Sequence, residues 1–190
     1  MKDIVLAGMA GSGKGTQARA LEEKLGDQMQ YFEPGAVLRS LTSNDNMIGN
    51  YTKAFLSAGK LLPNTFMKGL LTLVFSSLHE GYRLLIDGFP RMYEQKQVFD
   101  EVMAERKRDF IIFYLYITDE EAINRLSTRL VCPTCNSTYS THLEGNMTYC
   151  PHDGTRLIKR TDDTSLEAVQ KRIALFHEET SKLLQEYKDE

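Results

Sequence analysis

Short apolar runs alternate along the chain with longer stretches in which apolar residues recur at helical spacing. Residues 4–7, 82–87 and 110–117 are apolar runs of strand length, and residues 31–33 could form a shorter strand. The run at 110–117 is the most continuous, which predicts a parallel strand buried on both faces. Strands that alternate with helices predict an α/β fold with a parallel central sheet, and such sheets bind ligands at the carboxyl ends of their strands.

The helical stretches carry signals for where they begin and end. Asn44 or Asp45 is a candidate cap for the helix that follows, and Gly59 is placed to end that helix. Asp119 is predicted to cap a later helix. Helical spacing of apolar residues is found over residues 18–25, 37–41, 47–55, 66–78, 98–103, 122–126 and 166–187.

A glycine-rich stretch, Gly-Met-Ala-Gly-Ser-Gly-Lys-Gly-Thr at residues 8–16, separates the first predicted strand from the first predicted helix. A turn of this kind presents backbone N–H groups and a helix N-terminus to an anion, so it predicts a phosphate-binding loop. Lys14 is expected to reach terminal phosphates and Thr16 to lie near a metal. The alternative is a mobile glycine-rich turn with a stray lysine, which the flanking strand and helix disfavour.

Charged residues follow two other predicted elements. Asp87 ends the apolar run at 82–87, where a carboxylate beside a phosphate loop can hold Mg²⁺ or its waters. A capping or turn aspartate is the alternative. Arg125 and Arg129 are four residues apart, so on one helix they would share a face and act together on an anion. Alone, such a pair is more often a solvated surface.

Composition and charge narrow the classes of function. The 190 residues are enough for one domain with small insertions. The net charge of −3 argues against a general nucleic-acid or anionic-membrane binder. No apolar run reaches membrane-spanning length, and residues 4–7 are too few for the core of a signal peptide, so we expect a cytoplasmic protein.

The three cysteines lie close together, which indicates metal binding rather than disulfides. Cys132-Pro-Thr-Cys135 and Cys150-Pro-His-Asp153 are two knuckles of the kind that hold tetrahedral Zn²⁺. Asp153 stands where a fourth cysteine would, and His152 is the rival fourth ligand. The zinc would be structural and would stiffen a segment with little core of its own. A nucleic-acid zinc ribbon is the functional competitor, but no basic-aromatic cluster lies between the knuckles.

Together these motifs resemble the adenylate kinase family, in its long-lid bacterial type with a zinc-bearing lid. The resemblance runs from Met1 to about Tyr187 and includes Asp-Gly-Phe-Pro-Arg at residues 87–91 followed by Gln95, which is highly specific to nucleoside-monophosphate kinases. It implies a P-loop nucleotide-binding fold of three layers with a parallel central sheet. It further implies a core of residues 1–31, 62–128 and 161–190, a helical monophosphate-binding segment of residues 32–61 and a lid of residues 129–160.

The resemblance also implies a reaction, ATP + AMP = 2 ADP, assisted by Mg²⁺. The ATP site would contain Gly11, Ser12, Gly13, Lys14, Gly15, Thr16, Arg125, Arg129, Thr138 and Tyr139. The AMP site would contain Pro34, Gly35, Arg39, Lys60, Leu61, Leu62, Gly88, Phe89, Pro90, Arg91, Gln95, Arg160 and Arg172. The catalytic residues would be Lys14, Arg91, Arg129, Arg160 and Arg172, with Asp87 organising Mg²⁺ and Cys132, Cys135, Cys150 and Asp153 holding Zn²⁺. The partners would be ATP, AMP and ADP, with no nucleic acid or membrane, and we expect a monomer.

Some positions depart from the family pattern. Ala10 replaces a proline of the phosphate loop, and Asn64 replaces an aspartate. Pro34 replaces a threonine that contacts the AMP base, and Ala36 an aspartate that helps organise the waters of Mg²⁺, so these two positions bear on base selectivity and turnover. The sequence also stops near where the family adds a strand and a helix, which predicts four parallel strands with an unprotected edge.

Two other functions stay open on the sequence. One is a kinase of the same class that acts on a different purine monophosphate. The other is a nucleotide-binding protein that has lost turnover together with the aspartate replaced by Ala36. Lys14 and the arginines favour catalysis, because only catalysis explains positive charge on both sides of a transferred group.

Overall fold

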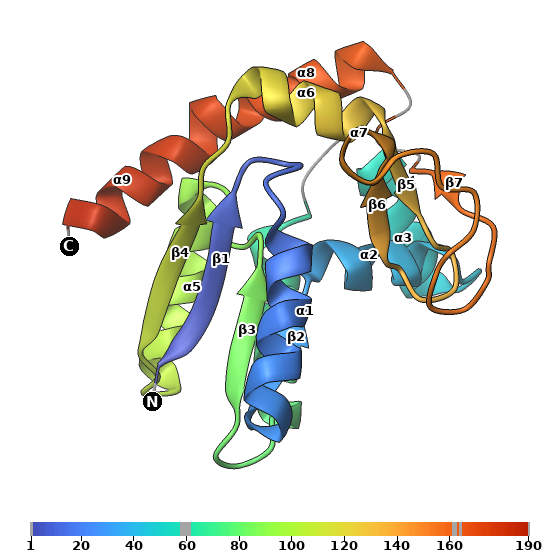
Figure 1. Ribbon diagram of the computed structural model, residues 1–190. Helices are drawn as coiled ribbons and strands as arrows, with labels where there is room; N and C mark the ends of the chain where they lie inside the picture. Colours follow the sequence, from blue (N-terminus) through green and yellow to red (C-terminus); the bar gives the residue numbers. More distant parts are fainter. Residues whose placement is uncertain (1, 58–61, 161–162, 164, 190) are drawn as a thin grey trace.

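A computed structural model describes residues 2–57, 62–160, 163 and 165–189 (Figure 1). The main sheet contains four parallel strands, in the order β2-β3-β1-β4. They are β1 (Asp3–Gly8), β2 (Met29–Phe32), β3 (Arg83–Asp87) and β4 (Phe110–Leu115). Because the strands are parallel, their carboxyl ends meet at one edge of the sheet, and the phosphate-loop sequence and Asp87 both lie there.

Helices cover both faces of this sheet. In chain order they are α1 (Lys14–Leu25), α2 (Pro34–Thr42), α3 (Met47–Ser57), α4 (Asn64–Ser77), α5 (Tyr93–Glu105), α6 (Asp119–Ser127), α8 (Leu166–Leu175) and α9 (Ser181–Asp189). Val5 packs with residues of α4 and α5, whereas its neighbours Ile4 and Leu6 pack with Ala18 of α1. This alternation along β1 confirms the expected three-layer α/β fold. None of the helices in the described ranges combines the length and apolarity needed to cross a membrane.

Strand β4 lies at the edge of the sheet and corrects one prediction. It pairs with β1 alone in the described sheet order, and Ile111 and Phe113 are 44% and 48% exposed. The prediction that this run is buried on both faces is therefore wrong. A continuous apolar run is typical of a central parallel strand, but pairing decides whether a strand is central. The described main sheet has the expected four parallel strands, with β4 as its last strand on this side.

Two of the predicted helix caps are also wrong, each by a small shift along the chain. The side chain of Asn46 accepts a hydrogen bond from the Gly49 N–H at 2.9 Å, so Asn46 occupies the capping role predicted for Asn44 or Asp45. Helix α6 is capped by Thr118, whose hydroxyl accepts from the Glu121 N–H at 3.2 Å, and Asp119 is its first helical residue. The predicted helix end at Gly59 lies outside the described residues.

The long C-terminal helix is interrupted. Ser165 caps α8, and a π-helical turn, Phe176–Thr180, separates α8 from α9. Figure 1 shows α8 and α6 side by side above the carboxyl edge of the main sheet.

A second, smaller sheet lies to one side of the main sheet (Figure 1). Its antiparallel strands are β5 (Arg129–Val131), β6 (Thr138–Ser140) and β7 (Ile158–Lys159), in the order β6-β5-β7, with the short helix α7 (Thr141–Glu144) after β6. Helix α6 ends at Ser127 and Arg129 begins β5. The prediction that Arg125 and Arg129 share one helix face is therefore wrong, although both line the same cavity.

Candidate functional site

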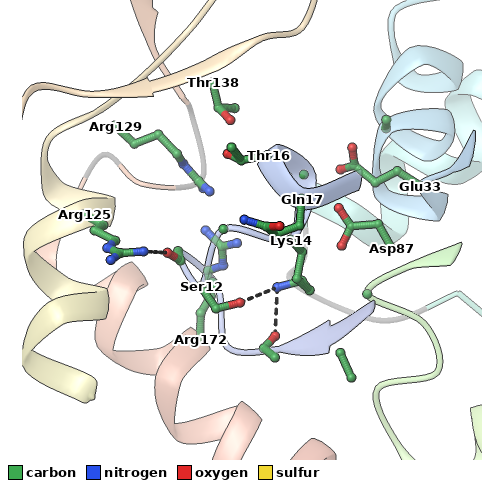
Figure 2. A pocket seen from close by; sticks show the side chains of 18 of the residues that line it. Ser12, Lys14, Thr16, Gln17, Glu33, Asp87, Arg125, Arg129, Thr138 and Arg172 are labelled. Carbon is green, nitrogen blue, oxygen red and sulfur yellow. Dashed lines mark hydrogen bonds between the residues drawn. The ribbon is translucent and has the colours of Figure 1, made fainter. Parts of the chain in front are cut away.

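The turn between β1 and α1 lies at the carboxyl edge of the main sheet (Figure 2). Gly13 precedes α1 with a φ of 91°, a left-handed conformation that favours glycine. A Cβ at Gly8 would lie 2.5 Å from the Leu115 carbonyl oxygen, so the loop passes this close to β4 only because residue 8 has no side chain. The loop and the first turn of α1 line a cavity, as a phosphate-binding loop requires.

Lys14 folds back over this loop. Its Nζ donates hydrogen bonds to the carbonyl oxygens of Gly8 at 2.8 Å and Met9 at 2.9 Å. Burial lowers the pKa of Lys14 to about 8, while the Asp87 carboxylate opposes this change and Arg91 adds to it. A phosphate bound at the loop would add negative charge beside this ammonium group and would raise its pKa.

Two carboxylates lie together beside Lys14 (Figure 2). The Tyr31 hydroxyl donates to Asp87 Oδ2 at 2.9 Å and lies 3.3 Å from Glu33 Oε2. Burial raises the pKa of Asp87, and the nearby Lys14 opposes this rise. Asp87 lines the cavity together with Thr16, so carboxylate and hydroxyl oxygens of the kind that Mg²⁺ prefers are available there.

Arginines from both sheets converge on the same cavity. Arg129 of β5 and Arg172 of α8 both donate to the buried carboxylate of Asp163, with Arg129 Nε 2.6 Å from Oδ2. Burial and, to a smaller extent, the positive charge of Arg160 together lower the pKa of Arg129 to about 10. Asp163 thus holds two arginines at the cavity, where their positive charge would stabilise an anionic ligand.

A further arginine lies in the turn after β3. Arg91 Nε donates to the Gly88 carbonyl oxygen at 2.6 Å. A Cβ at Gly88, whose φ is 67°, would lie 3.0 Å from Arg91 Nη2 and 3.6 Å from Lys14 Cε. Glycine at this turn therefore lets the Arg91 guanidinium approach it closely. The surrounding protein lowers the pKa of Arg91, and Arg172 lowers it further.

Arg39 of α2 makes an ion pair with Glu33, with Nη2 2.7 Å from Oε1. A Cβ at Gly35 would lie 3.0 Å from Arg39 Nη1, so glycine leaves room for this guanidinium. Gln95 is buried, and its Oε1 accepts a hydrogen bond from the Arg91 N–H at 2.9 Å. Gln95 thus supports the backbone of Arg91 in this conformation.

The phosphate-loop sequence, the two carboxylates beside Lys14 and several of the arginines line a cavity of about 880 Å³, a volume within the usual range of ligand pockets. Predicted site residues that line it are Gly11, Ser12, Gly13, Lys14, Gly15, Thr16, Asp87, Gly88, Pro90, Arg91, Arg125, Arg129, Thr138, Tyr139, Arg160 and Arg172. Predicted site residues that do not line it are Pro34, Gly35, Arg39, Leu62, Phe89 and Gln95, and Lys60 and Leu61 lie outside the described residues. The cavity therefore gathers the predicted ATP side and the catalytic cations, but only part of the predicted AMP side.

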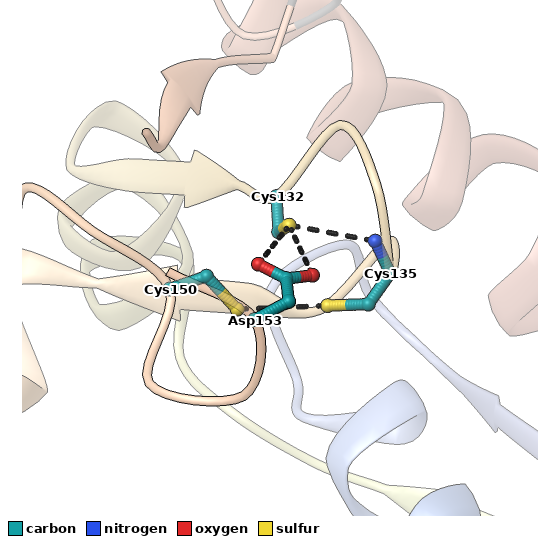
Figure 3. A group of neighbouring side chains, drawn as sticks. All are labelled: Cys132, Cys135, Cys150 and Asp153. Carbon is teal, nitrogen blue, oxygen red and sulfur yellow. Dashed lines mark hydrogen bonds between the residues drawn. The ribbon is translucent and has the colours of Figure 1, made fainter. Parts of the chain in front are cut away.

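The three cysteines and Asp153 form a cluster beside the small sheet (Figure 3). Their ligand atoms all lie within 4.8 Å of one another. Cys135 Sγ is 3.6 Å from Cys150 Sγ, and Cys132 Sγ is 3.3 Å from Asp153 Oδ2. A tetrahedral zinc with sulfur ligands at 2.3 Å would hold those ligands about 3.8 Å apart, so this donor set fits a structural zinc.

The two knuckles have the same backbone geometry. The Asn136 N–H donates to the Cys132 carbonyl oxygen at 3.0 Å, and the Gly154 N–H donates to the Cys150 carbonyl oxygen at 2.9 Å. Asn136 and Gly154 both have positive φ, 58° and 70°. Asp153 therefore occupies in the second knuckle the place that Cys135 has in the first. This equivalence favours Asp153 over His152 as the fourth ligand.

Comparisons with known proteins agree with this geometry. The sequence model of the family "Adenylate kinase" matches residues 6–190. The chain belongs to the adenylate kinase family. An adenylate kinase of Chlamydia trachomatis serovar D is 33% identical over 198 residues, covering 97% of this chain and 78% of that protein. Those of Chlamydia felis and Hydrogenobaculum sp. are 33% and 32% identical, each over 97% of this chain and over 84% and 87% of the relative.

Membership of the adenylate kinase family makes this chain a phosphotransferase and supports nucleoside-monophosphate kinase activity. The Cys₃Asp cluster is a group that could hold zinc.

Several residues of the site were not predicted from the sequence. Tyr31 and Glu33 lie next to Asp87 and line the cavity, and the buried Asp163 links two of the arginines. Tyr31 lies near the carboxyl end of β2 and Glu33 directly follows this strand, which was the available signal, because the carboxyl ends of parallel strands form the ligand edge. The sequence gives no comparable signal for the linking role of Asp163, since that role depends on contacts with distant elements.

Proposed function

We propose that the chain transfers a phosphoryl group reversibly from ATP to AMP and so forms two molecules of ADP. The observation that supports this most is the set of five cations around one cavity: Lys14, Arg91, Arg129, Arg160 and Arg172. In-line phosphoryl transfer needs alignment of two substrates and positive charge around the transferred group, with little covalent chemistry from the protein. A general base is not required.

On the donor side, we assign the ATP phosphates to residues 11–16, with Lys14 at the β- and γ-phosphates. To reach them, Nζ leaves the carbonyl oxygens of Gly8 and Met9. Arg125, whose Nη1 donates to the Gly11 carbonyl oxygen at 3.3 Å, would pack near the ATP base. Thr138 and Tyr139 would touch ATP from the small sheet. The Tyr139 hydroxyl lies 3.3 Å from Cys150 Sγ, so the ring rather than the hydroxyl is available to the nucleotide in this conformation.

On the acceptor side, Arg39 and Arg91 would bind the AMP phosphate, and Gln95 would bind the adenine. Glu33 holds Arg39 at 2.7 Å, so AMP must take this guanidinium from the carboxylate. The remaining assigned contacts are Pro34, Gly35, Lys60, Leu61, Leu62, Gly88, Phe89, Pro90, Arg160 and Arg172. Residues 32–61 and 129–160 are the segments proposed to close over the substrates and exclude water, because water at the same position would hydrolyse ATP.

Two metals complete the proposal. Mg²⁺, bound with ATP, would neutralise phosphate charge beside Asp87 and Thr16. Zn²⁺ would be structural and held by Cys132, Cys135, Cys150 and Asp153, a set that leaves no position open for a substrate.

The test is ADP formation by the purified full chain from ATP and Mg²⁺ with AMP, GMP, CMP or UMP in turn. The proposal expects ADP with AMP and far slower reaction with the pyrimidine monophosphates. Protein that binds ATP and AMP yet forms no ADP would overturn the proposal and leave a nucleotide-binding protein without turnover.

A different purine monophosphate is the second candidate, and the acceptor pocket supplies the reason. Pro34 is buried at the first position of α2, and its side chain cannot donate a hydrogen bond to a base. Preference for GMP over AMP in the same assay would establish this candidate.

A further inference from the structure

The π-helical turn Phe176–Thr180 changes which side chains of the C-terminal helix face the cavity. Its first residue is fixed: Phe176 is buried in a cluster with Met9 and Leu126, and its ring stacks on Tyr114 at a centroid distance of 6.3 Å. A π-helical turn adds one residue to an α-helix and is frequent at functional sites. The last residue of the turn is Thr180.

Thr180 and Arg172 are eight residues apart. In a regular α-helix such residues are separated by about 80° around the axis, and one inserted residue reduces this angle to about 20°. Both residues line the cavity. The π-helical turn therefore places Thr180 on the same face of the helix as Arg172.

Thr180 contacts the backbone of Arg91. It is 7% exposed, and its Oγ1 donates to the Arg91 carbonyl oxygen at 2.7 Å across 89 residues of sequence. The N–H of the same residue donates to Gln95 Oε1 at 2.9 Å, and its Nε to the Gly88 carbonyl oxygen at 2.6 Å. Hydrogen bonds thus hold Arg91 at its N–H, its carbonyl and its side chain, and the carbonyl bond comes from a distant helix.

We propose that Thr180 is a positioning residue for Arg91. This inference rests on the proposed function, in which Arg91 binds the phosphate of AMP. Because its carbonyl is already fixed, Arg91 has less motion to lose when the substrate binds. Small errors in the position of such a group slow phosphoryl transfer markedly. The C-terminal helix then supplies Arg172 to the reaction directly and positions Arg91 through Thr180.

The test compares four variants of the full chain: Thr180→Val, which keeps the shape and removes the hydroxyl, Thr180→Ser, which keeps the hydroxyl, Thr180→Ala and Arg91→Ala. Thr180→Val is expected to raise the KM for AMP about tenfold, the effect of losing one hydrogen bond to a buried group, with the KM for ATP unchanged within about twofold. Hydrogen exchange over residues 88–95 should become faster. Thr180→Ser should restore the AMP KM and the slow exchange, and Thr180→Ala serves as a second hydroxyl-free variant.

A merely structural role would lower the melting temperature of Thr180→Val without a selective change in the AMP KM, and this result would overturn the inference. Failure of Thr180→Ser to restore the wild-type values would overturn it too, because packing and not the hydroxyl would then be responsible. Wild-type protein that forms no ADP would overturn the proposed function alone, since exchange over residues 88–95 and calorimetry with AMP still test the bond from Thr180.

Discussion

The two sheets of this molecule are held together by different forces. Around the main sheet, Leu71, Phe99 and Val102 belong to one large apolar cluster and are 0% exposed. Around the small sheet, the buried cluster consists of Cys132, Cys150 and Leu157, so two of its three members are cysteines. The main sheet can fold through burial of apolar surface, whereas the small sheet has too little of that surface to do so.

This difference has a functional side. The main sheet carries Lys14, Asp87 and Arg91 on a rigid framework, while Arg129 comes from the small sheet and reaches the same cavity through Asp163. We therefore expect damage to the two sheets to produce different kinds of failure.

The largest expected effect is on the small sheet. Removing the metal with a chelator, or changing Cys132→Ser, should unfold residues 129–160 while the main sheet stays folded, because structural zinc contributes about 10–16 kcal/mol to small zinc-binding peptides. Hydrogen exchange resolved by region, together with metal analysis, measures this. Thr134→Ser, in the same knuckle but not a ligand, should behave as wild type. A small sheet that keeps its protection without metal would remove the contrast between the two sheets.

The next effect separates chemistry from folding within the main sheet. Arg91→Ala should lower kcat/KM by about 10²–10³ because charge at the transferred group is lost, with little change in the melting temperature. Steady-state ADP formation and thermal unfolding measure the two quantities. Arg106→Ala is the matched control, since Arg106 Nη2 donates to the Ser76 hydroxyl at 3.1 Å and does not line the cavity. Full activity in the Arg91 variant would refute its place in the site.

A smaller effect tests whether burial holds the main sheet. Leu71→Ala should lower the free energy of unfolding by about 2–5 kcal/mol, since Leu71 is 0% exposed at the centre of the large cluster. Leu73→Ala on the same helix should change it by less than about 0.5 kcal/mol, because Leu73 is 65% exposed. Chemical denaturation measures both. If Leu71→Ala instead loosened the small sheet first, as seen by hydrogen exchange, the two sheets would not be independent.

Sequence reasoning was most accurate for local features: the turn between β1 and α1 and the clustering of the three cysteines with Asp153 are both present. The phosphate loop is nine consecutive residues between a strand and a helix, and the knuckles are two four-residue turns, so spacing alone indicated both. Sequence reasoning failed where contacts with residues distant in the sequence decide the position of an element. Strand β4 has the composition of a central strand but lies at the edge, and Arg129 has helical spacing from Arg125 but begins a new strand.

The contacts of Asp163 and Thr180 show the same limit. Asp163 accepts hydrogen bonds from Arg129 and Arg172, which lie on different elements. Thr180 reaches Arg91 only because a π-helical turn rotates it, and sequence periodicity assumes a regular helix. The capping errors are of another kind: neighbouring Asn, Asp and Thr residues can all cap a helix, and the local path of the backbone decides between them.

The smallest expected effect concerns the charge that the main sheet holds beside its phosphate loop. The pKa of Lys14 is lowered from 10.5 to about 8 by burial, so between pH 8 and 10.5 the unfolded chain binds a proton at this lysine that the folded chain does not. The stability of wild type should therefore rise with pH across this window relative to Lys14→Met, whose residue 14 does not titrate. The destabilisation caused by burying the charged Lys14 should approach but not exceed about 3 kcal/mol. It is fully present below pH 8, where the folded and the unfolded chain both bind the proton. Unfolding free energies of the two proteins from pH 7 to 10.5 measure it, and other titrating groups cancel in the comparison.

Inorganic phosphate or ATP should reduce the difference, because a bound anion restores the charged form of Lys14. Parallel curves for the two proteins would show that the loop holds its lysine without electrostatic cost. The contrast between the main sheet and the small sheet would then rest on packing alone.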